Sequence, residues 1–391
     1  MRVAFTLIGG ESWTGGYNYL LNLLHVLGQH QRARLTPVLF VSDACTEVDI
    51  ASFAAIQGVE VVRTPLLNVS RRTGSLAQGL LLGRDNALQR LFKSHSINVV
   101  FESAQYFGWR LGMPVIAWIP DLQHKALPHL FTRSAWWKRE IGFRAQVMSG
   151  RTIMVSSEDA RRACEQHYPS ARGRTRTVHF AVPPGSRIPY SEARAVADSY
   201  GLPEHFFFMP NQFWRHKNHG LVLEALVILR ERGRQIVVAA SGKQCDPRAP
   251  AYFAAFQGRL AQGGLQNEFR LLGMIPYPHL APLMRACTAM LNPSLFEGWS
   301  TTVEEARAMG TPMVLSDLDV HREQMGEQAS YFDRHSAQSL TETLDGVVAM
   351  DGVQRELLAD AARIAALRRA EQFAEDFVGL AARCLDESGS R

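Results

Sequence analysis

The stretch Asn292–Gly310, NPSLFEGWSTTVEEARAMG, decides the fold because it joins a short apolar run to a helix. The apolar residues before it predict a strand, and Gly310 followed by Pro312 predicts the end of the helix. Between them, Thr301 with Glu304 three residues later predicts a helix that begins with a capping box. A strand, a loop and a capped helix in this order form the repeating unit of α/β domains.

The same stretch carries groups that suit a ligand with both phosphates and hydroxyls. The free amides at the helix start favour an anion, and Gly298 lets a ligand approach the backbone closely. Glu297 and Glu305 stand eight residues apart, and both can project toward that ligand. Carboxylates accept hydrogen bonds from the hydroxyls of a nucleotide sugar. A surface helix with solvated glutamates is the alternative that this spacing alone leaves open.

Short apolar runs alternate with amphipathic segments on both sides of this stretch. We expect strands at Val3–Ile8, Pro37–Val41, Val59–Val62, Asn98–Glu102, Val115–Ile119, Thr152–Val155, Phe206–Met209, Ile236–Ala240, Phe269–Leu272, Ala289–Asn292 and Met313–Ser316. The alternation stops at residues 182–186, VPPGS, which continue neither a helix nor a strand. The sequence therefore predicts an α/β fold with two doubly wound domains that face each other across a cleft.

Composition narrows the class of protein. The chain has 391 residues, 46% hydrophobic and 20% charged, which is typical of a globular protein with two or three domains. No apolar run approaches the roughly 20 residues that span a bilayer, and the first residues predict a strand rather than a signal peptide. The five cysteines are scattered without a C-x-x-C pair, which favours a reducing cytoplasm over a disulfide framework.

The stretch 292–310 resembles the Glu-x7-Glu signature of the family 4 retaining glycosyltransferases, which have a GT-B fold of two Rossmann-like domains. Asn292-Pro293-Ser294 and the residues 306–312 also fit that family. The resemblance is specific over residues 206–333 and looser in the first half. It implies that Glu297 contacts the transferred sugar and its phosphate and that Glu305 holds the ribose hydroxyls. It places further donor-binding groups at Gly298, Trp299, Ser300 and Thr301.

The resemblance also implies that the two domains bind different substrates. Residues 1–185 form an N-terminal acceptor-binding domain and residues 186–370 a C-terminal nucleotide-sugar-binding domain. Residues 371–391 form a helical tail that returns to the N-terminal domain.

A basic loop follows the first strand of the second domain. It reads PNQFWRHKNH over residues 210–219, and Lys217 can offset the charge of a diphosphate. The family usually has an Arg about five residues before this Lys, where this chain has Gln212. Arg215 is the candidate that replaces it.

Glycines flank the first strand-to-helix loop. Gly9-Gly10 and Gly15-Gly16 let a phosphate approach the backbone and the amides of the next helix, although tight turns alone also use such glycines. The spacing is not G-x-G-x-x-G, which argues against a nicotinamide dehydrogenase. The loop resembles the N-terminal glycine loop of the family, which implies that it closes over the donor diphosphate.

Residues 119–124, IPDLQH, follow another apolar run. The resemblance places this loop near the acceptor, where Asp121 matches by position and His124 is a candidate. Either side chain can position or deprotonate an acceptor hydroxyl, and a loop-capping Asp with a structural His is the alternative. Asp317-Leu318-Asp319 has the D-x-D form of metal-dependent enzymes but lies beyond the donor helix. We therefore expect no metal and no cofactor besides the nucleotide sugar.

The charge of the chain is uneven. Residues 1–190 carry 22 Lys and Arg against 12 Asp and Glu, whereas residues 191–391 carry 20 against 25. Within the basic half, residues 131–144 (FTRSAWWKREIGFR) combine tryptophans with arginines, and Arg71 and Arg72 add charge. We expect peripheral contact with the inner face of the cytoplasmic membrane and a polyprenyl-diphosphate-linked acceptor. A helix with buried tryptophans is the alternative, and no signature of a nucleic-acid-binding fold is present.

These observations predict a retaining glycosyltransferase that moves a sugar from a nucleoside diphosphate sugar to a hydroxyl of a carbohydrate or lipid-linked oligosaccharide. Two alternatives stay open. One is a nucleotide-sugar epimerase or hydrolase of the same fold, which needs no acceptor. The other is a non-catalytic protein that binds a nucleotide sugar without turnover.

Overall fold

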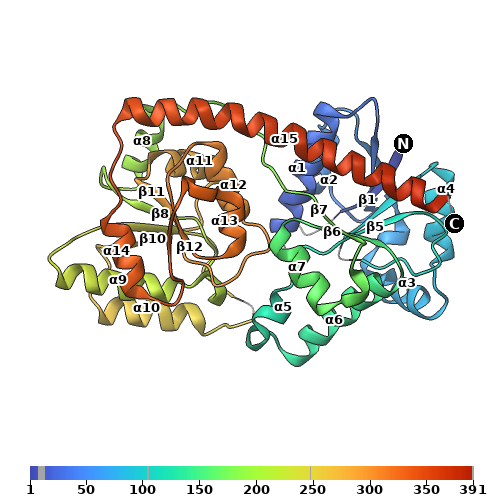
Figure 1. Cartoon of the computed structure of the whole chain (residues 1–391), viewed down its shortest axis with the longest axis horizontal. Coiled ribbons are helices and arrows are strands. Elements are labelled where there is room, and N and C mark those ends of the chain that lie inside the picture. The colour runs from blue at the N-terminus through green and yellow to red at the C-terminus, as the bar shows by residue number, and fades with distance from the viewer. Residues whose placement is uncertain (8–13, 104, 247, 390–391) are drawn as a thin grey trace. The chain divides into compact units, whose positions relative to one another are not determined.

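The computed structural model describes residues 1–7, 14–103, 105–246 and 248–389. They form two compact α/β units (Figure 1). The first comprises Met1–Leu122, Arg133–Pro183 and Arg368–Arg391, and the second comprises Gln123–Thr132 and Pro184–Leu367. The chain therefore passes between the units more than once.

The first unit contains a seven-stranded parallel sheet in the order β3-β2-β1-β4-β5-β6-β7. Its strands are β1 (Arg2–Thr6), β2 (Thr36–Ser42), β3 (Glu60–Thr64), β4 (Val99–Ser103), β5 (Val115–Trp118), β6 (Thr152–Val155) and β7 (Thr175–Thr177). Its helices are α1 (Thr14–His30), α2 (Glu47–Ala54), α3 (Val69–Leu81), α4 (Asn86–Ser94), α6 (Arg133–Met148) and α7 (Glu158–His167). The central strands are buried on both faces, which explains their continuous apolar runs.

The second unit contains a six-stranded parallel sheet in the order β10-β9-β8-β11-β12-β13. Its strands are β8 (Phe207–Met209), β9 (Val238–Ser241), β10 (Phe269–Gly273), β11 (Ala289–Asn292), β12 (Met313–Ser316) and β13 (Ser330–Phe332). Its helices are α5 (Gln123–Ala126), α8 (Tyr190–Ser199), α9 (His219–Glu231), α10 (Tyr252–Gln262), α11 (Tyr277–Ala286), α12 (Thr301–Ala308), α13 (Asp319–Met325) and α14 (Ala337–Asp345). The predicted α/β class with two parallel sheets is confirmed.

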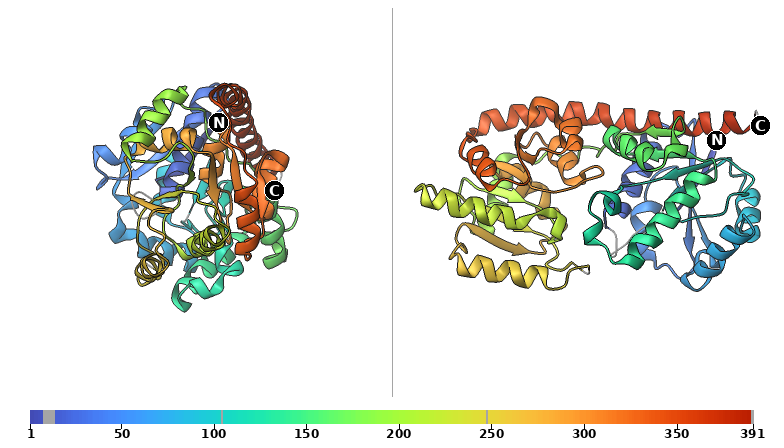
Figure 2. Two further views of the ribbon diagram at one scale, coloured as in Figure 1. Left: turned by 90° about the vertical axis from the view of Figure 1, so that its left-hand side faces the viewer. Right: turned by 60° about the horizontal axis from the view of Figure 1, so that its bottom comes forward.

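Helices cover both faces of the second sheet. Helices α9, α10 and α14 pack on one face, and α8, α11, α12 and α13 pack on the other. Figures 1 and 2 show α9 and α10 side by side on the same side of the sheet. The carboxyl ends of the strands are left to loops, which is where ligands bind in doubly wound sheets.

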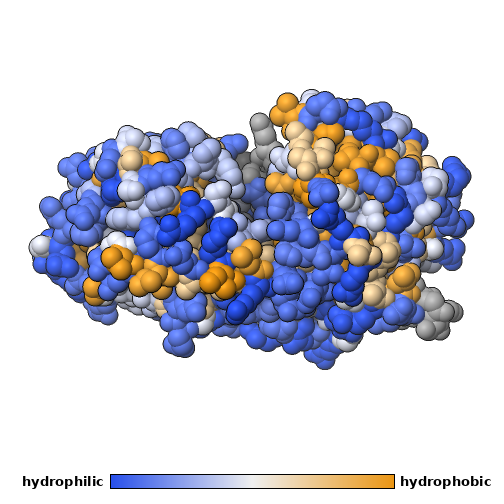
Figure 3. All heavy atoms as spheres, turned by 90° about the horizontal axis from the view of Figure 1, so that it is seen from above, coloured by the Kyte–Doolittle hydropathy of each residue, from blue (hydrophilic) through white to orange (hydrophobic). Residues whose placement is uncertain are grey.

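The last helix, α15 (Gly352–Gly389), belongs to both units. Its second half is buried in the first unit, where Phe377 stacks against Phe5 and Phe373 meets Tyr19 edge-on. Seen from above, apolar side chains follow its first half along the surface of the second unit (Figure 3). The large exposed ones on that half are Val353, Leu357, Leu358, Ile364 and Leu367. Within the described ranges, no helix is long and apolar enough to cross a membrane.

Candidate functional site

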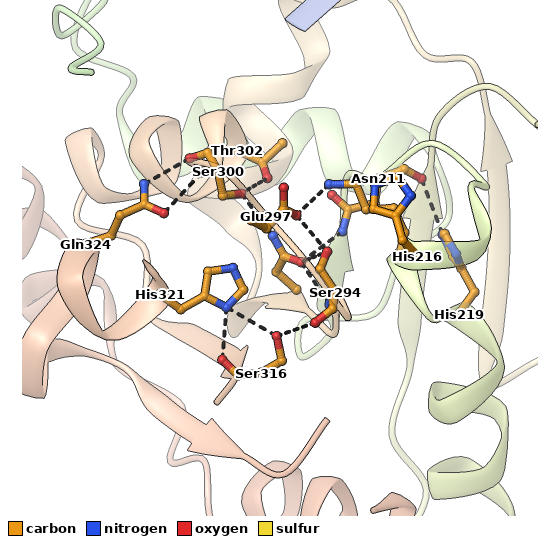
Figure 4. Close-up of polar contacts among 12 residues, drawn as sticks. Asn211, His216, His219, Ser294, Glu297, Ser300, Thr302, Ser316, His321 and Gln324 are labelled. Carbon is orange, nitrogen blue, oxygen red and sulfur yellow. Dashed lines mark hydrogen bonds and ion pairs between the residues drawn. The ribbon is translucent and has the colours of Figure 1, made fainter. Parts of the chain in front are cut away.

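Side chains of the second unit meet at the carboxyl edge of its sheet (Figure 4). Lys217 ends a 3-10 turn, residues 215–217, that follows β8, and Glu297 lies in the loop that follows β11. Ser316 ends β12 and His321 comes from α13. The strand order places β8, β11 and β12 side by side, so segments far apart in sequence reach one place.

Lys217 and Glu297 form a nearly buried ion pair. Lys217 Nζ lies 2.6 Å from Glu297 Oε1, and the two side chains are 14% and 10% exposed. Burial alone would raise the pKa of Glu297, but the charges of Lys217 and His216 outweigh burial and lower it to about 2. The Glu297 carboxylate is therefore ionised at neutral pH, and it neutralises the positive charge of Lys217.

A buried polar scaffold fixes the loop that carries Glu297. Ser294 Oγ donates to Glu297 Oε1 at 2.7 Å, and Ser316 Oγ donates to the Ser294 carbonyl oxygen at 2.7 Å. His321 Nδ1 lies 2.9 Å from the Ser316 carbonyl oxygen. Asn292 Oδ1 accepts from the Ser294 amide at 3.2 Å. Because buried polar groups are costly unless paired, this network holds the loop in one conformation.

The start of α12 differs from the predicted capping box. Ser300, not Thr301, is the N-cap residue, and its side chain does not cap the helix. Ser300 Oγ accepts from Asn292 Nδ2 at 3.1 Å, and Glu304 is buried 3.7 Å from Arg307. The capping-box prediction is wrong because Thr301 is already the first residue of the helix and not its N-cap.

Gln324 of α13 holds the backbone of Ser300 from the other side. Its Oε1 accepts the Ser300 amide at 3.2 Å, and its Nε2 donates to the Ser300 carbonyl oxygen at 3.1 Å. Ser300 was a candidate donor-binding residue, yet its amide and hydroxyl are engaged inside the protein. The amides of Thr301 and Thr302 come next, at the positions that a helix leaves without an internal acceptor.

Glu305 lies one turn further along α12 in a different environment. Its side chain is partly buried, and burial raises its pKa to about 7. At the other end of the helix, Gly310 has a φ of +68°, and a Cβ there would lie 2.6 Å from the Leu358 carbonyl oxygen of α15. Gly310 thus ends the helix where the sequence predicted.

The other residues predicted to bind the donor lie in three separate segments of the chain. Gly298 and Trp299 are partly buried in the loop before α12. Arg215 is exposed, and its amide donates to Asp246 Oδ2 at 3.3 Å. Gly15 and Gly16 belong to the first turn of α1 in the first unit, and Gly9-Gly10 lie outside the described residues.

The two candidate acceptor residues fall in different units. Asp121 belongs to the first unit, where its carboxylate pairs with Arg139 at 3.1 Å. His124 belongs to the second unit, on α5, and is fully buried. In the described part of the chain, no three His, Cys, Asp or Glu side chains are grouped to hold a metal ion.

The sequence did not single out several polar residues around this site. They are Asn211, whose Nδ2 donates to Asn292 Oδ1 at 3.4 Å, and His216, Asp246, His321 and Gln324. They are scattered over the chain, and only the folded sheet brings them together. Asn292 and Ser294 carried a signal, since they fit the family motif, but the motif said nothing of their hydrogen bonds.

Residues 197–365 match the family model for glycosyl transferases group 1. This match lies within the second unit, Pro184–Leu367. A putative glycosyltransferase, EpsF of Bacillus subtilis, is 32% identical over 108 residues. The match covers 27% of this chain, and the chain spans about a quarter (26%) of the length of that curated relative.

Solved glycosyltransferase structures resemble the whole chain. One from Rickettsia africae has a TM-score of 0.72 at 13% identity, with 98% of each chain covered. Anabaena HepE, solved with UDP and glucose, has a TM-score of 0.66 at 15% identity, with 100% of each chain covered. WaaG, described as involved in lipopolysaccharide biosynthesis, has a TM-score of 0.56 at 16% identity, with 99% of this chain and 98% of WaaG covered. These likenesses confirm the expected GT-B fold.

Proposed function

We propose that the protein is a retaining glycosyltransferase that moves a hexose-type sugar from a nucleoside diphosphate sugar to a hydroxyl of a carbohydrate acceptor, without a metal ion. The observation that carries this proposal is the Lys217–Glu297 pair, 2.6 Å apart, beside the amino end of α12. A cation, a carboxylate and open helix amides meet there. This combination suits a ligand that carries both a diphosphate and sugar hydroxyls.

Each group has a role in this reaction. The amides of Thr301 and Thr302 and the ammonium of Lys217 stabilise the negative charge of the departing diphosphate. Glu305 accepts hydrogen bonds from the ribose hydroxyls, and Glu297 faces the transferred sugar. The acceptor attacks from the side on which the diphosphate leaves, which retains the anomeric configuration. A diphosphate oxygen takes the acceptor proton, so no strong base is required.

The remaining residues serve the approach of the two substrates. Gly298 and Trp299 shape the loop next to the sugar, and Arg215 adds positive charge to the diphosphate side. We assign Gly15 and Gly16 to backbone contacts with the diphosphate. We assign Asp121 to the positioning of the acceptor hydroxyl, and the fully buried His124 to the support of the segment that follows it.

The relatives support the donor class. HepE was solved with UDP-glucose as well as with UDP and glucose, at 15% identity to this chain. The description of WaaG supports a role in the assembly of a surface polysaccharide, and with it a cytoplasmic site of action. The base and the sugar of the donor are left to experiment.

The acceptor is proposed to be lipid-linked, with the first unit in peripheral contact with an anionic membrane. Helix α6 exposes Trp137, Ile141 and Met148, and the exposed Lys138 and Arg144 add charge to the same helix. Such a helix suits an anionic lipid surface. The intact protein should sediment with vesicles that contain anionic phospholipid, and the double variant Trp137→Ala/Lys138→Ala should not. Equal sedimentation of both would refute the membrane contact.

The first experiment measures the thermal stability of the purified protein with UDP, GDP, ADP, CDP and dTDP. One of them at 100 times its dissociation constant should stabilise the fold by about 2.7 kcal/mol. The sugar conjugates of that nucleotide are then incubated with and without carbohydrate acceptors. Product that forms only with an acceptor supports transfer. Donor conversion without an acceptor would indicate an epimerase or hydrolase, and binding without turnover would indicate a non-catalytic protein.

A further inference from the structure

The proposed donor site needs more positive charge than Lys217 supplies. The diphosphate of a nucleotide sugar carries about two negative charges, whereas the single charge of Lys217 is neutralised by Glu297. The amino end of a helix contributes only about half a charge. Further charged hydrogen-bond donors near Lys217 would strengthen the binding of a diphosphate.

Arg248 offers such donors from the loop that follows β9, where Asp246 balances its charge as Glu297 balances that of Lys217. Its Nε lies 3.1 Å from Asp246 Oδ1, and its Nη2 lies 3.5 Å from Nδ1 of His216, the residue next to Lys217. The guanidinium also lies 5.4 Å from the centre of the Trp214 ring, a distance at which a cation is attracted to an aromatic face. Arg248 is therefore fixed against the turn that carries Lys217.

Asp246 ties this loop to that turn. Its side chain is 2% exposed, and its two oxygens accept from the amides of Arg215 at 3.3 Å and of Arg248 at 3.0 Å. Burial opposes ionisation, but the hydrogen bonds and charge of Arg248 keep the pKa of Asp246 below its usual value. The carboxylate stays charged and orients the guanidinium.

His216 does not compete with Arg248 for an anion. Burial and the neighbouring charge of Lys217 lower its pKa to about 3, so the imidazole is neutral at physiological pH. The Arg248 side chain is 31% exposed, which leaves part of its five-donor fork accessible to a ligand. A cavity of about 170 Å³ in the second unit opens beside Arg215 and Arg248, large enough for a phosphate group.

We infer that Arg248 is a diphosphate-binding residue, the second cation of the donor site, and that Asp246 and Trp214 are its positioning residues. The inference rests on the proposed function, because it names a further contact of the same donor. The planar fork of Arg binds two phosphate oxygens at once, a geometry that Lys cannot reproduce. Arg248 therefore fixes the direction of the diphosphate, whereas Lys217 supplies a point charge.

The test compares the affinities of the nucleoside and of the nucleoside diphosphate that stabilises the wild type, measured by calorimetry at 150 mM salt. Arg248→Gln should weaken diphosphate binding tenfold to a hundredfold, as expected for the loss of charge-assisted hydrogen bonds, and should leave nucleoside binding within about twofold. Arg248→Lys should recover part of the loss. The salt dependence of diphosphate binding should also become shallower in Arg248→Gln.

Two control variants separate charge from packing. Gln123→Ala removes a neutral contact, since Gln123 Oε1 accepts from Arg248 Nη1 at 3.0 Å. Arg259→Ala removes a cation that pairs with Glu224 elsewhere in the unit, at 2.9 Å. Both controls should keep the diphosphate affinity and salt dependence of the wild type, and unfolding midpoints establish that every variant is folded.

The outcomes separate this inference from the proposed function. A wild type that binds a nucleoside diphosphate, with unchanged affinity in Arg248→Gln, overturns the inference and leaves the proposed function standing. A raised acceptor KM in Arg248→Gln with normal diphosphate affinity also overturns it, since Arg248 would then serve the acceptor. A wild type that binds no member of the nucleotide panel contradicts both.

Discussion

The loop before α12 and the helix itself each carry a glutamate, and the two carboxyl groups are in opposite electrostatic states. Glu297 in the loop pairs with Lys217 and has a pKa of about 2. Burial raises the pKa of Glu305, on the helix, to about 7. One side chain is a permanent anion at neutral pH, and the other is close to half protonated.

The difference shows that motif spacing does not set the chemistry of these residues. Both glutamates belong to one stretch of sequence, but only the loop reaches the turn after β8 that carries Lys217. Glu305 meets burial without a compensating cation. We therefore expect a loss of function to come from changes at Glu297 and a pH dependence to come from Glu305.

The largest effect is expected from Glu297→Gln, which keeps the shape of the side chain and removes its charge. Loss of one preorganised charged group at a reacting centre costs roughly a hundredfold to a thousandfold in kcat. Nucleoside diphosphate affinity should hold or rise, because Lys217 no longer pairs with a carboxylate. Steady-state kinetics with the identified donor measure the first effect and calorimetry the second.

Glu224→Gln is the control for that variant, since Glu224 is an exposed partner of Arg259 on α9. It should behave as wild type. A kcat for Glu297→Gln within tenfold of the wild-type value would contradict the assignment of Glu297 to the reacting sugar.

The second largest effect is expected from removing the cation of the Lys217–Glu297 ion pair. Lys217→Met leaves the Glu297 carboxylate buried without its cation, which should lower the free energy of unfolding by about 3 kcal/mol at pH 7. Because the pair lowers the pKa of Glu297, its stabilisation is present above about pH 4.5 and is lost as the pH falls toward 2. Urea unfolding of the wild type and the variant over this range measures the loss.

The double variant Lys217→Met/Glu297→Gln should regain most of that stability, since no buried charge is left unpaired. If the double variant is as unstable as Lys217→Met, the loss comes from packing and the two side chains are not coupled.

The helix glutamate should show the reverse dependence on pH. Its raised pKa means that the native state binds the proton more tightly than the unfolded state, so stability falls as the pH rises from about 4.5 through 7. Glu305→Gln should be more stable than the wild type by roughly 3 kcal/mol at pH 8 and nearly equal to it at pH 4. Denaturant unfolding at pH 4, 5, 6, 7 and 8 measures the difference, and a pH-independent difference would contradict the burial argument.

Much of the fold could be predicted because its strands are buried on both faces. The apolar runs at Ala289–Asn292 and Met313–Ser316 are strands with those bounds. The short edge strands β7 and β13 were missed, since three residues such as Thr175–Thr177 show no periodicity. They form strands because they pair with β6 and β12. Such pairing between distant segments cannot be predicted from the few residues of the strand itself.

In the candidate site, too, local sequence predicted some features, and others depend on contacts between distant segments. The family resemblance indicated Glu297, Glu305 and Lys217 as donor residues, and the structure brings Lys217 and Glu297 within 2.6 Å. The capping box failed because the helix begins one residue earlier than predicted, with Ser300 as its N-cap, and Asn292 and Gln324 hold Ser300 there. Such contacts depend on the order of strands in the sheet, which no single motif contains.

The smallest effect concerns Ser300, the residue at which the loop and the helix join. Gln324→Ala removes both side-chain hydrogen bonds to the Ser300 backbone, which should cost about 1 kcal/mol of unfolding free energy. Because the amides of α12 become less well positioned, the donor KM should rise a few-fold while kcat stays near the wild-type value. Gln338→Ala on α14 is the control, since Gln338 bonds only within its own exposed helix turn among the described contacts. A kcat that falls more than tenfold in Gln324→Ala would mean that the loop with Glu297 moves together with the helix, and the two regions would then have to be treated as one.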